Sequence, residues 1–217
     1  MSLVNYAAIL CNCGKFQESA VVLEEIDIYK RNFDGFPFHR ERIEMNNRII
    51  INYLSGKAKA KECKAAYEEL VKESEGIAEG IFYKSNYAIF MALDGEIEAA
   101  YKLLSKVLLS NDKEQRYNYR INVNLASFAY LCGKVEEALI RLEETLAWFN
   151  TSNTTDSIYQ KKRLLLLLDY INKNVTAPAP TEWDAIHIGG RSSHYQATPH
   201  DYYERGFVYT IVYHWDI

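Results

Sequence analysis

Four glycines at intervals of 42, 39 and 38 residues constrain the fold of this 217-residue chain more than any other feature. Each glycine stands nine residues after an asparagine. The pairs are Asn5 with Gly14, Asn47 with Gly56, Asn86 with Gly95, and Asn124 with Gly133. A period of this length is typical of proteins in which one supersecondary unit is stacked on copies of itself. The sequence therefore predicts a repeat architecture.

Each repeated segment has the pattern of two helices separated by a turn. Before the glycine, apolar residues recur at helical spacing, as in Tyr87, Ala88 and Met91. Glycine enters the left-handed conformation without penalty, so we expect Gly95 and Gly133 to have positive φ at helix ends. Five residues after a glycine stands a small residue, which lets the paired helices approach closely. These small residues are Ser19, Ala100 and Ala138.

The pattern Asn-x-Ala-(x)6-Gly-(x)4-Ala, seen in residues 86–100 and 124–138, resembles the tetratricopeptide repeat. The resemblance implies an all-α solenoid of about four antiparallel helix pairs, which we extend with one extra helix to a domain of residues 1–175. The second unit departs from the pattern. Arg48 and Asn52 stand where apolar residues are expected, and Lys61 where a small residue is expected. Its packing is therefore the least predictable.

A short second segment, residues 176–217, differs from the repeats. It begins with the linker prolines Pro178 and Pro180, and its residues 181–217 contain no lysine, eight aromatic residues and four of the five histidines. Apolar and polar residues alternate over residues 207–217, as in a half-buried β-strand. We expect this strand to pair with residues 183–188, to cap the end of the solenoid and to leave an edge open to a second chain.

The inner wall formed by the first helix of each unit is the predicted binding surface, because stacked first helices make the concave side of such solenoids. Asparagine amides both donate and accept hydrogen bonds, and aromatic rings supply contact area, so the wall suits an extended peptide. The alternative is that the same asparagines bond between neighbouring helices. The predicted peptide-binding residues are Asn47, Tyr53, Ser85, Asn86, Arg120, Asn124, Ser127 and Tyr130.

Some tetratricopeptide repeats hold a carboxylate between basic residues of successive first helices. In this chain the matching places are taken by Ile43, Phe82 and Arg120, and Asn124 stands where the arginine of such a clamp would be. A single cation does not make such a clamp, so the resemblance does not extend to carboxylate recognition.

Composition argues against several functions. The 25 basic residues are outnumbered by 29 acidic ones, which disfavours nucleic acid. The longest apolar run, five leucines at residues 164–168, is too short to span a bilayer.

The four cysteines form no CxxC pair, which predicts free thiols in the cytoplasm and no metal. The segment's histidines lack the spacing of a zinc enzyme, so we assign neither catalytic residues nor a cofactor. Those histidines are His187, His194, His200 and His214.

The sequence thus favours a scaffold that binds a protein or peptide partner and performs no chemistry of its own. The alternative is a C-terminal sensor or regulatory fragment of a larger signalling ATPase or toxin-type effector, with residues 181–217 carrying ligand sensing or catalysis. The first helix starts within a residue or two of Met1, which favours further repeats or an effector domain upstream. The neighbouring coding sequence distinguishes the two.

Overall fold

The structure is a computed structural model that describes residues 3–12, 15–32, 38–77, 80–110, 115–150, 161, 164–165, 167–169 and 171–173. It contains the helices α1 (Leu3–Asn12), α2 (Phe16–Asn32), α3 (Phe38–Leu54), α4 (Ala60–Glu73), α5 (Gly80–Leu93), α6 (Ile97–Ser110), α7 (Gln115–Leu131) and α8 (Val135–Asn150). Further helical residues between 161 and 172 follow α8. These ranges contain no strand, so the all-α prediction is confirmed for them. The predicted strands lie outside them.

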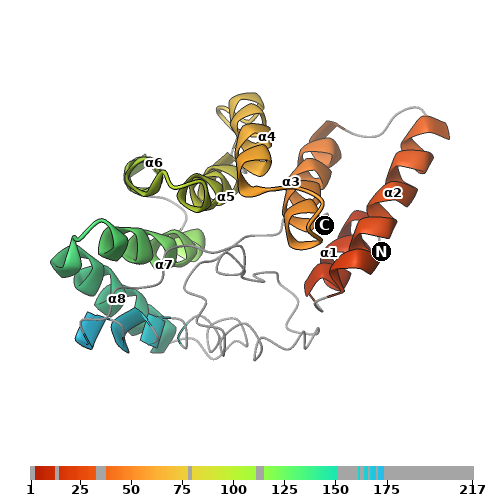
Figure 1. Ribbon diagram of the computed structural model, residues 1–217. Coiled ribbons are helices and arrows are strands. Elements are labelled where there is room, and N and C mark those ends of the chain that lie inside the picture. Colours follow the sequence, from red (N-terminus) through yellow and green to blue (C-terminus); the bar gives the residue numbers. More distant parts are fainter. Residues whose placement is uncertain are drawn as a thin grey trace.

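The helices pack in consecutive pairs, and the pairs are joined in chain order into an arc (Figure 1). Within the arc, α1, α3, α5 and α7 lie toward the inner side, and α2, α4, α6 and α8 lie toward the outer side. We call these two sets the inner and outer helices. Contacts of α4 with α5 and of α6 with α7 connect one pair to the next, so the units share a continuous core. None of the helices in the described ranges is long and apolar enough to cross a membrane.

The turn glycines have the conformation that the sequence predicts. The φ angles of Gly56, Gly95 and Gly133 are 76°, 91° and 75°, while Gly14 lies outside the described residues. The residue after each glycine donates its backbone amide to the carbonyl of the residue four before that glycine. The amide of Glu96 donates to Met91 at 2.8 Å, and the amide of Lys134 donates to Ala129 at 2.8 Å. This bond satisfies a carbonyl that the helix end would otherwise leave without a partner. Each inner helix therefore ends in the same way.

Small residues bring the paired helices together, as predicted for three units. Ser19, Ala100 and Ala138 are fully buried, and the Ser19 hydroxyl donates to the Ala7 carbonyl at 2.6 Å. In the second unit Lys61, which departs from the pattern, is exposed. The buried Cys63 takes the place, and its thiol donates to the Ile49 carbonyl at 3.7 Å.

The reason for this difference is the length of the turn. Helix α4 begins four residues after Gly56, whereas α6 and α8 begin two residues after their glycines. The two additional residues move the packing position from Lys61 to Cys63. Ala7 and Ile49, the acceptors of Ser19 and Cys63, both stand seven residues before their glycines. The second unit therefore keeps the geometry of the repeat despite its different sequence.

Arg48, the second departure from the repeat pattern, links two helices. Its guanidinium lies 2.7 Å from the Asp27 carboxylate of α2 and 2.5 Å from the Glu44 carboxylate of its own helix α3. Glu44 also pairs with Lys30 of α2 at 2.5 Å, and only 6% of its side chain is exposed. Charged groups thus replace apolar contact where α3 packs on the first unit.

Candidate functional site

The predicted binding residues all lie on inner helices. Asn47 and Tyr53 are on α3, Ser85 and Asn86 on α5, and Arg120, Asn124, Ser127 and Tyr130 on α7. The side chains of Asn47, Asn86 and Asn124 have no exposed surface, and those of Tyr53, Ser85 and Ser127 are also buried. Tyr130 is half-buried, and the Arg120 side chain lies outside the described residues.

Two of the asparagines form a repeated link between successive inner helices. The Asn86 amide donates to Oδ1 of Asn46 on α3 at 2.9 Å, and the Asn124 amide donates to the Ser85 hydroxyl on α5 at 3.4 Å. In both cases the donor stands nine residues before its own glycine and the acceptor ten residues before the preceding glycine. These bonds are those of the alternative role, in which the asparagines join neighbouring helices. We call this pair of contacts the amide ladder.

The amide ladder is reinforced at α3 by a tyrosine from an outer helix. The Tyr67 hydroxyl donates to Oδ1 of Asn46 at 3.0 Å and lies 3.3 Å from the Asn86 amide. The Asn46 amide in turn donates to Oδ1 of Asn47 at 3.0 Å. Burial raises the pKa of Tyr67 well above its ordinary value, so the phenol keeps its proton.

Sequence reasoning missed Asn46 and Tyr67, although both belong to this network. Asn46 stands one residue before a repeated asparagine, which is the only sequence signal that it carried. Tyr67 lies on α4, whose register is shifted by the longer turn, so its position could not be read from the repeat pattern.

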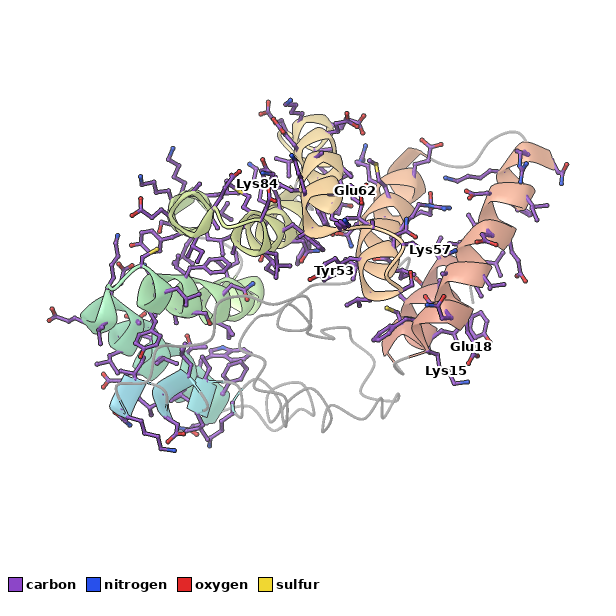
Figure 2. The ribbon with its side chains drawn as sticks, in the orientation of Figure 1. Lys15, Glu18, Tyr53, Lys57, Glu62 and Lys84 are labelled. Carbon is purple, nitrogen blue, oxygen red and sulfur yellow. The ribbon has the colours of Figure 1, made fainter. Side chains whose placement is uncertain are left out.

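A second set of inner-helix residues consists of Tyr53 and the residues at equivalent positions of the repeat. Figure 2 shows Tyr53 extending from α3 toward that side, and its ring meets the Phe90 ring edge-on at a centroid distance of 5.1 Å. Helix residues three apart lie on one face, so Ile50 shares the face of Tyr53. The equivalent positions, six and three residues before Gly56, Gly95 and Gly133, define the inner stripe. Its members are Ile50, Tyr53, Ile89, Ala92, Ser127 and Tyr130.

The inner stripe is apolar and aromatic, and it carries hydroxyl groups but no formal charge. Ile43 and Phe82, which occupy two of the places where a carboxylate clamp would need cations, are respectively buried and half-buried apolar residues. Within the described ranges, no group of three His, Cys, Asp or Glu side chains is placed to hold a metal ion. Five of its six members are buried and Tyr130 is half-buried, and side chains of this kind suit contact with apolar and aromatic groups rather than charge pairing.

Comparison with known proteins gives information about the fold of this chain and not about its activity. No protein-family model matches the chain, and no curated protein is significantly similar to it. Among solved structures, the chain is similar to Bacillus thuringiensis PlcR, which was crystallised in complex with the peptide PapR7 and DNA, with a TM-score of 0.60 and 15% identity. The match covers 80% of this chain and 64% of the PlcR chain, so this chain corresponds to less than two thirds of PlcR. The helical repeat of this chain thus has the fold of part of PlcR.

Proposed function

We propose that this chain is a peptide-binding repeat scaffold that holds an extended segment of a partner protein along the inner stripe. The observation that carries the proposal is the repetition of the inner stripe at equivalent positions of α3, α5 and α7. Equivalent side chains on successive parallel helices offer regularly spaced contacts, which is what an extended peptide requires.

The similarity to PlcR supports the proposal. PlcR has been crystallised with a bound peptide, and its fold is similar to that of 80% of this chain. We propose binding rather than catalysis as the activity of the helical part. The buried thiol of Cys63, which forms no disulfide, fits a reducing compartment, so we place the scaffold in the cytoplasm. The excess of acidic over basic residues argues against nucleic acid as a partner.

The two sets of inner-helix residues have different roles in this proposal. Asn86 and Asn124 hold successive inner helices in register through the amide ladder. Tyr53, Ser127 and Tyr130 belong to the inner stripe and contact the ligand. Aromatic side chains often contribute much of the binding energy of an interface. Tyr130 is half-buried, so removing its ring tests the inner stripe with the least damage to the core.

The test is selection of ligands from a displayed library of 12-residue peptides, followed by affinity measurement by fluorescence anisotropy. Tyr130→Ala removes a ring from the inner stripe, and Tyr29→Ala removes the same ring from α2, where Tyr29 is 50% exposed. We expect Tyr130→Ala to weaken binding by roughly tenfold or more, the scale of a lost aromatic anchor.

The matched control, Tyr29→Ala, should leave the affinity within about twofold, since surface changes away from a binding site have small effects. If the library yields no ligand, or if both variants weaken binding equally, the inner stripe is not a peptide-binding surface and the proposal fails.

A further inference from the structure

The amide ladder does not extend to the first unit, which α1 and α2 form at one end of the arc (Figure 1). The ladder acceptors Asn46 and Ser85 stand ten residues before the glycines of their units. In the first unit this place belongs to Val4, which is buried and has no hydrogen-bonding group in its side chain. The ladder that joins α3 to α5 and α5 to α7 therefore cannot continue from α3 to α1.

Charged side chains link the first unit to the second. Arg48 of α3 pairs with Asp27 of α2 at 2.7 Å, and its guanidinium also donates to the Leu23 carbonyl at 3.2 Å. Glu44 of α3 pairs with Arg48 and with Lys30 of α2, in each case at 2.5 Å. Two carboxylates, an ammonium and a guanidinium thus lie where α2 packs on α3. We call this group the charged contact.

The second and third units are linked by a different kind of contact. The rings of Tyr67 on α4 and Phe90 on α5 stack at a centroid distance of 5.4 Å, and both side chains are 0% exposed. This contact is aromatic and closed to water. In the charged contact, by comparison, the side chains of Arg48 and Asp27 are 26% and 47% exposed.

The difference affects the free energy needed to separate neighbouring units. Separating Tyr67 from Phe90 exposes apolar surface to water, so the whole hydrophobic contribution of the contact is lost. Separating the charged contact lets water solvate the four ionic groups again, which recovers much of the desolvation penalty that their burial costs. A unit of a repeat protein is held only by its neighbours, so an end unit with the weaker contact opens first.

We propose that α1 and α2 form a hinged unit, which moves away from α3 at the charged contact while α3 to α8 keep their packing. Within the unit, the buried Ser19 hydroxyl of α2 donates to the Ala7 carbonyl of α1 at 2.6 Å, so the two helices move together. The inference goes beyond the proposed function, because it holds whether or not a peptide binds the inner stripe. The first unit would then be a movable end of the arc.

Two cysteines of the chain report on this opening. Cys11 occupies the place in α1 that Tyr53 occupies in α3, and Tyr53 contacts Phe90 of the next inner helix. Cys11 therefore lies where α1 packs on α3. Cys63 lies inside the second unit, between α4 and α3, because its thiol donates to the Ile49 carbonyl. The two cysteines are similarly buried, at 1% and 2% exposure.

The test is the rate of alkylation of each thiol by iodoacetamide in the native full chain, compared with the rate in the urea-unfolded chain. The ratio of the unfolded to the native rate is the protection factor, because a buried thiol reacts only when its cover moves away. Tandem mass spectrometry of the digested chain assigns the label to each cysteine. We expect the protection factor of Cys11 to be about tenfold or more below that of Cys63.

Arg48→Met tests whether the charged contact keeps the first unit closed. The substitution removes a partner of both Asp27 and Glu44, so we expect the protection factor of Cys11 to fall by about fivefold or more. That of Cys63 should stay within about twofold, since its cover lies inside the second unit. The matched control, Arg141→Met, breaks the pair with Glu137 in the fourth unit and should leave both factors unchanged.

Ser19→Cys distinguishes a hinged unit from one that unfolds. It places a thiol between α1 and α2, as Cys63 lies between α3 and α4, and this thiol should stay protected when Arg48→Met exposes Cys11. Loss of its protection together with that of Cys11 would mean that the first unit unfolds. Equal protection of Cys11 and Cys63 in the native chain, or an equal fall in both with Arg48→Met, would mean that the first unit opens only with the whole protein. Each of these results would overturn the inference.

Discussion

The Asn86 amide lies 2.9 Å from Oδ1 of Asn46, and this bond joins two inner helices that are 40 residues apart in the chain. Oδ1 of Asn46 also accepts from Tyr67 at 3.0 Å, and all three side chains are fully buried. Removing this one oxygen would take away the shorter hydrogen bond of each donor and leave only the longer ones, from the Asn86 amide to the Tyr67 hydroxyl and from that hydroxyl to the Asn46 carbonyl, both at 3.3 Å.

We therefore predict that Asn46→Ala lowers the free energy of unfolding by about 2–4 kcal/mol, because the Asn46 side chain makes three hydrogen bonds to buried groups. Urea denaturation monitored by circular dichroism measures it. Asn52→Ala, at a half-buried position on the same helix, is the matched control and should cost under about 1 kcal/mol. Equal losses in the two variants would show that the amide ladder does not stabilise the arc.

The turn glycines give a second prediction, based on backbone conformation alone. Gly95 has a φ of 91°, and a methyl group added there meets no atom within 4 Å. Gly95→Ala should cost about 1–2 kcal/mol, the energy of placing an L residue in the left-handed region. Thermal or urea denaturation provides the value.

Gly80→Ala provides the contrast, because there the cost is steric. An added Cβ at Gly80 would lie 2.7 Å from the Ser74 carbonyl oxygen, a backbone atom that cannot move aside easily. We expect Gly80→Ala to destabilise the protein more than Gly95→Ala. The opposite order would contradict the geometry of the turn between α4 and α5.

Arg48 yields a third prediction, concerning the charged link between α2 and α3. Arg48→Met removes one partner of Glu44, whose side chain is only 6% exposed, and should cost about 1–3 kcal/mol, reduced because the Arg48 side chain is itself 26% exposed. Lys57→Met, which breaks the exposed pair with Glu24, should cost under about 0.5 kcal/mol. Comparable losses in urea denaturation would mean that the Arg48 link stabilises no more than a surface pair.

The low reactivity of the Cys63 thiol is a fourth prediction. Burial, together with the charge of Glu62, raises the pKa of the Cys63 thiol from 9.0 to about 12. At pH 8 its thiolate fraction is then on the order of 10⁻⁴, and the buried sulfur is shielded from reagents. Labelling with a thiol reagent in native buffer should modify the half-buried Cys132 well before Cys63, and denaturant should make both reactive. Equal native rates would show that Cys63 is not enclosed between α3 and α4.

The same shift sets a pH dependence of stability. Because the folded pKa is above the unfolded value, the folded state holds the proton more tightly. The stabilising contribution of the protonated thiol is complete below about pH 9 and is lost as pH rises toward about 12. Cys63→Ala should reduce the fall in stability over this range, as measured by urea denaturation at a series of pH values.

The repeated elements of the fold could be predicted from sequence because they depend on local chemistry. Glycine at a helix end, as at Gly95 and Gly133, and a small residue between paired helices, as at Ala100 and Ala138, leave fixed spacings in the chain. The packing residue of the second unit could not be predicted, because two extra turn residues move that position from Lys61 to Cys63 without leaving a local signal.

The helices that carry the candidate residues could be predicted from the sequence, but the partners of those residues could not. The spacing placed Asn86 and Asn124 on the inner helices, yet it could not decide between a ligand and a neighbouring helix as their partner. That decision depends on Asn46 and Ser85, which come from other units and meet the asparagines only after folding. Contacts across 39 or 40 residues leave no periodic signal of their own.

The central claim, that peptides bind along the inner side of the arc, is tested most directly by isoleucine-methyl NMR of the full chain titrated with a library-selected peptide. Ile50 and Ile89 report on the inner stripe, while Ile28 and Ile140, which are 52% and 51% exposed, report on the outer helices α2 and α8. We predict saturable shifts of the Ile50 and Ile89 methyl signals, with Ile28 and Ile140 unchanged. Shifts confined to Ile28 or Ile140 would place the ligand on the outer helices and contradict the proposal.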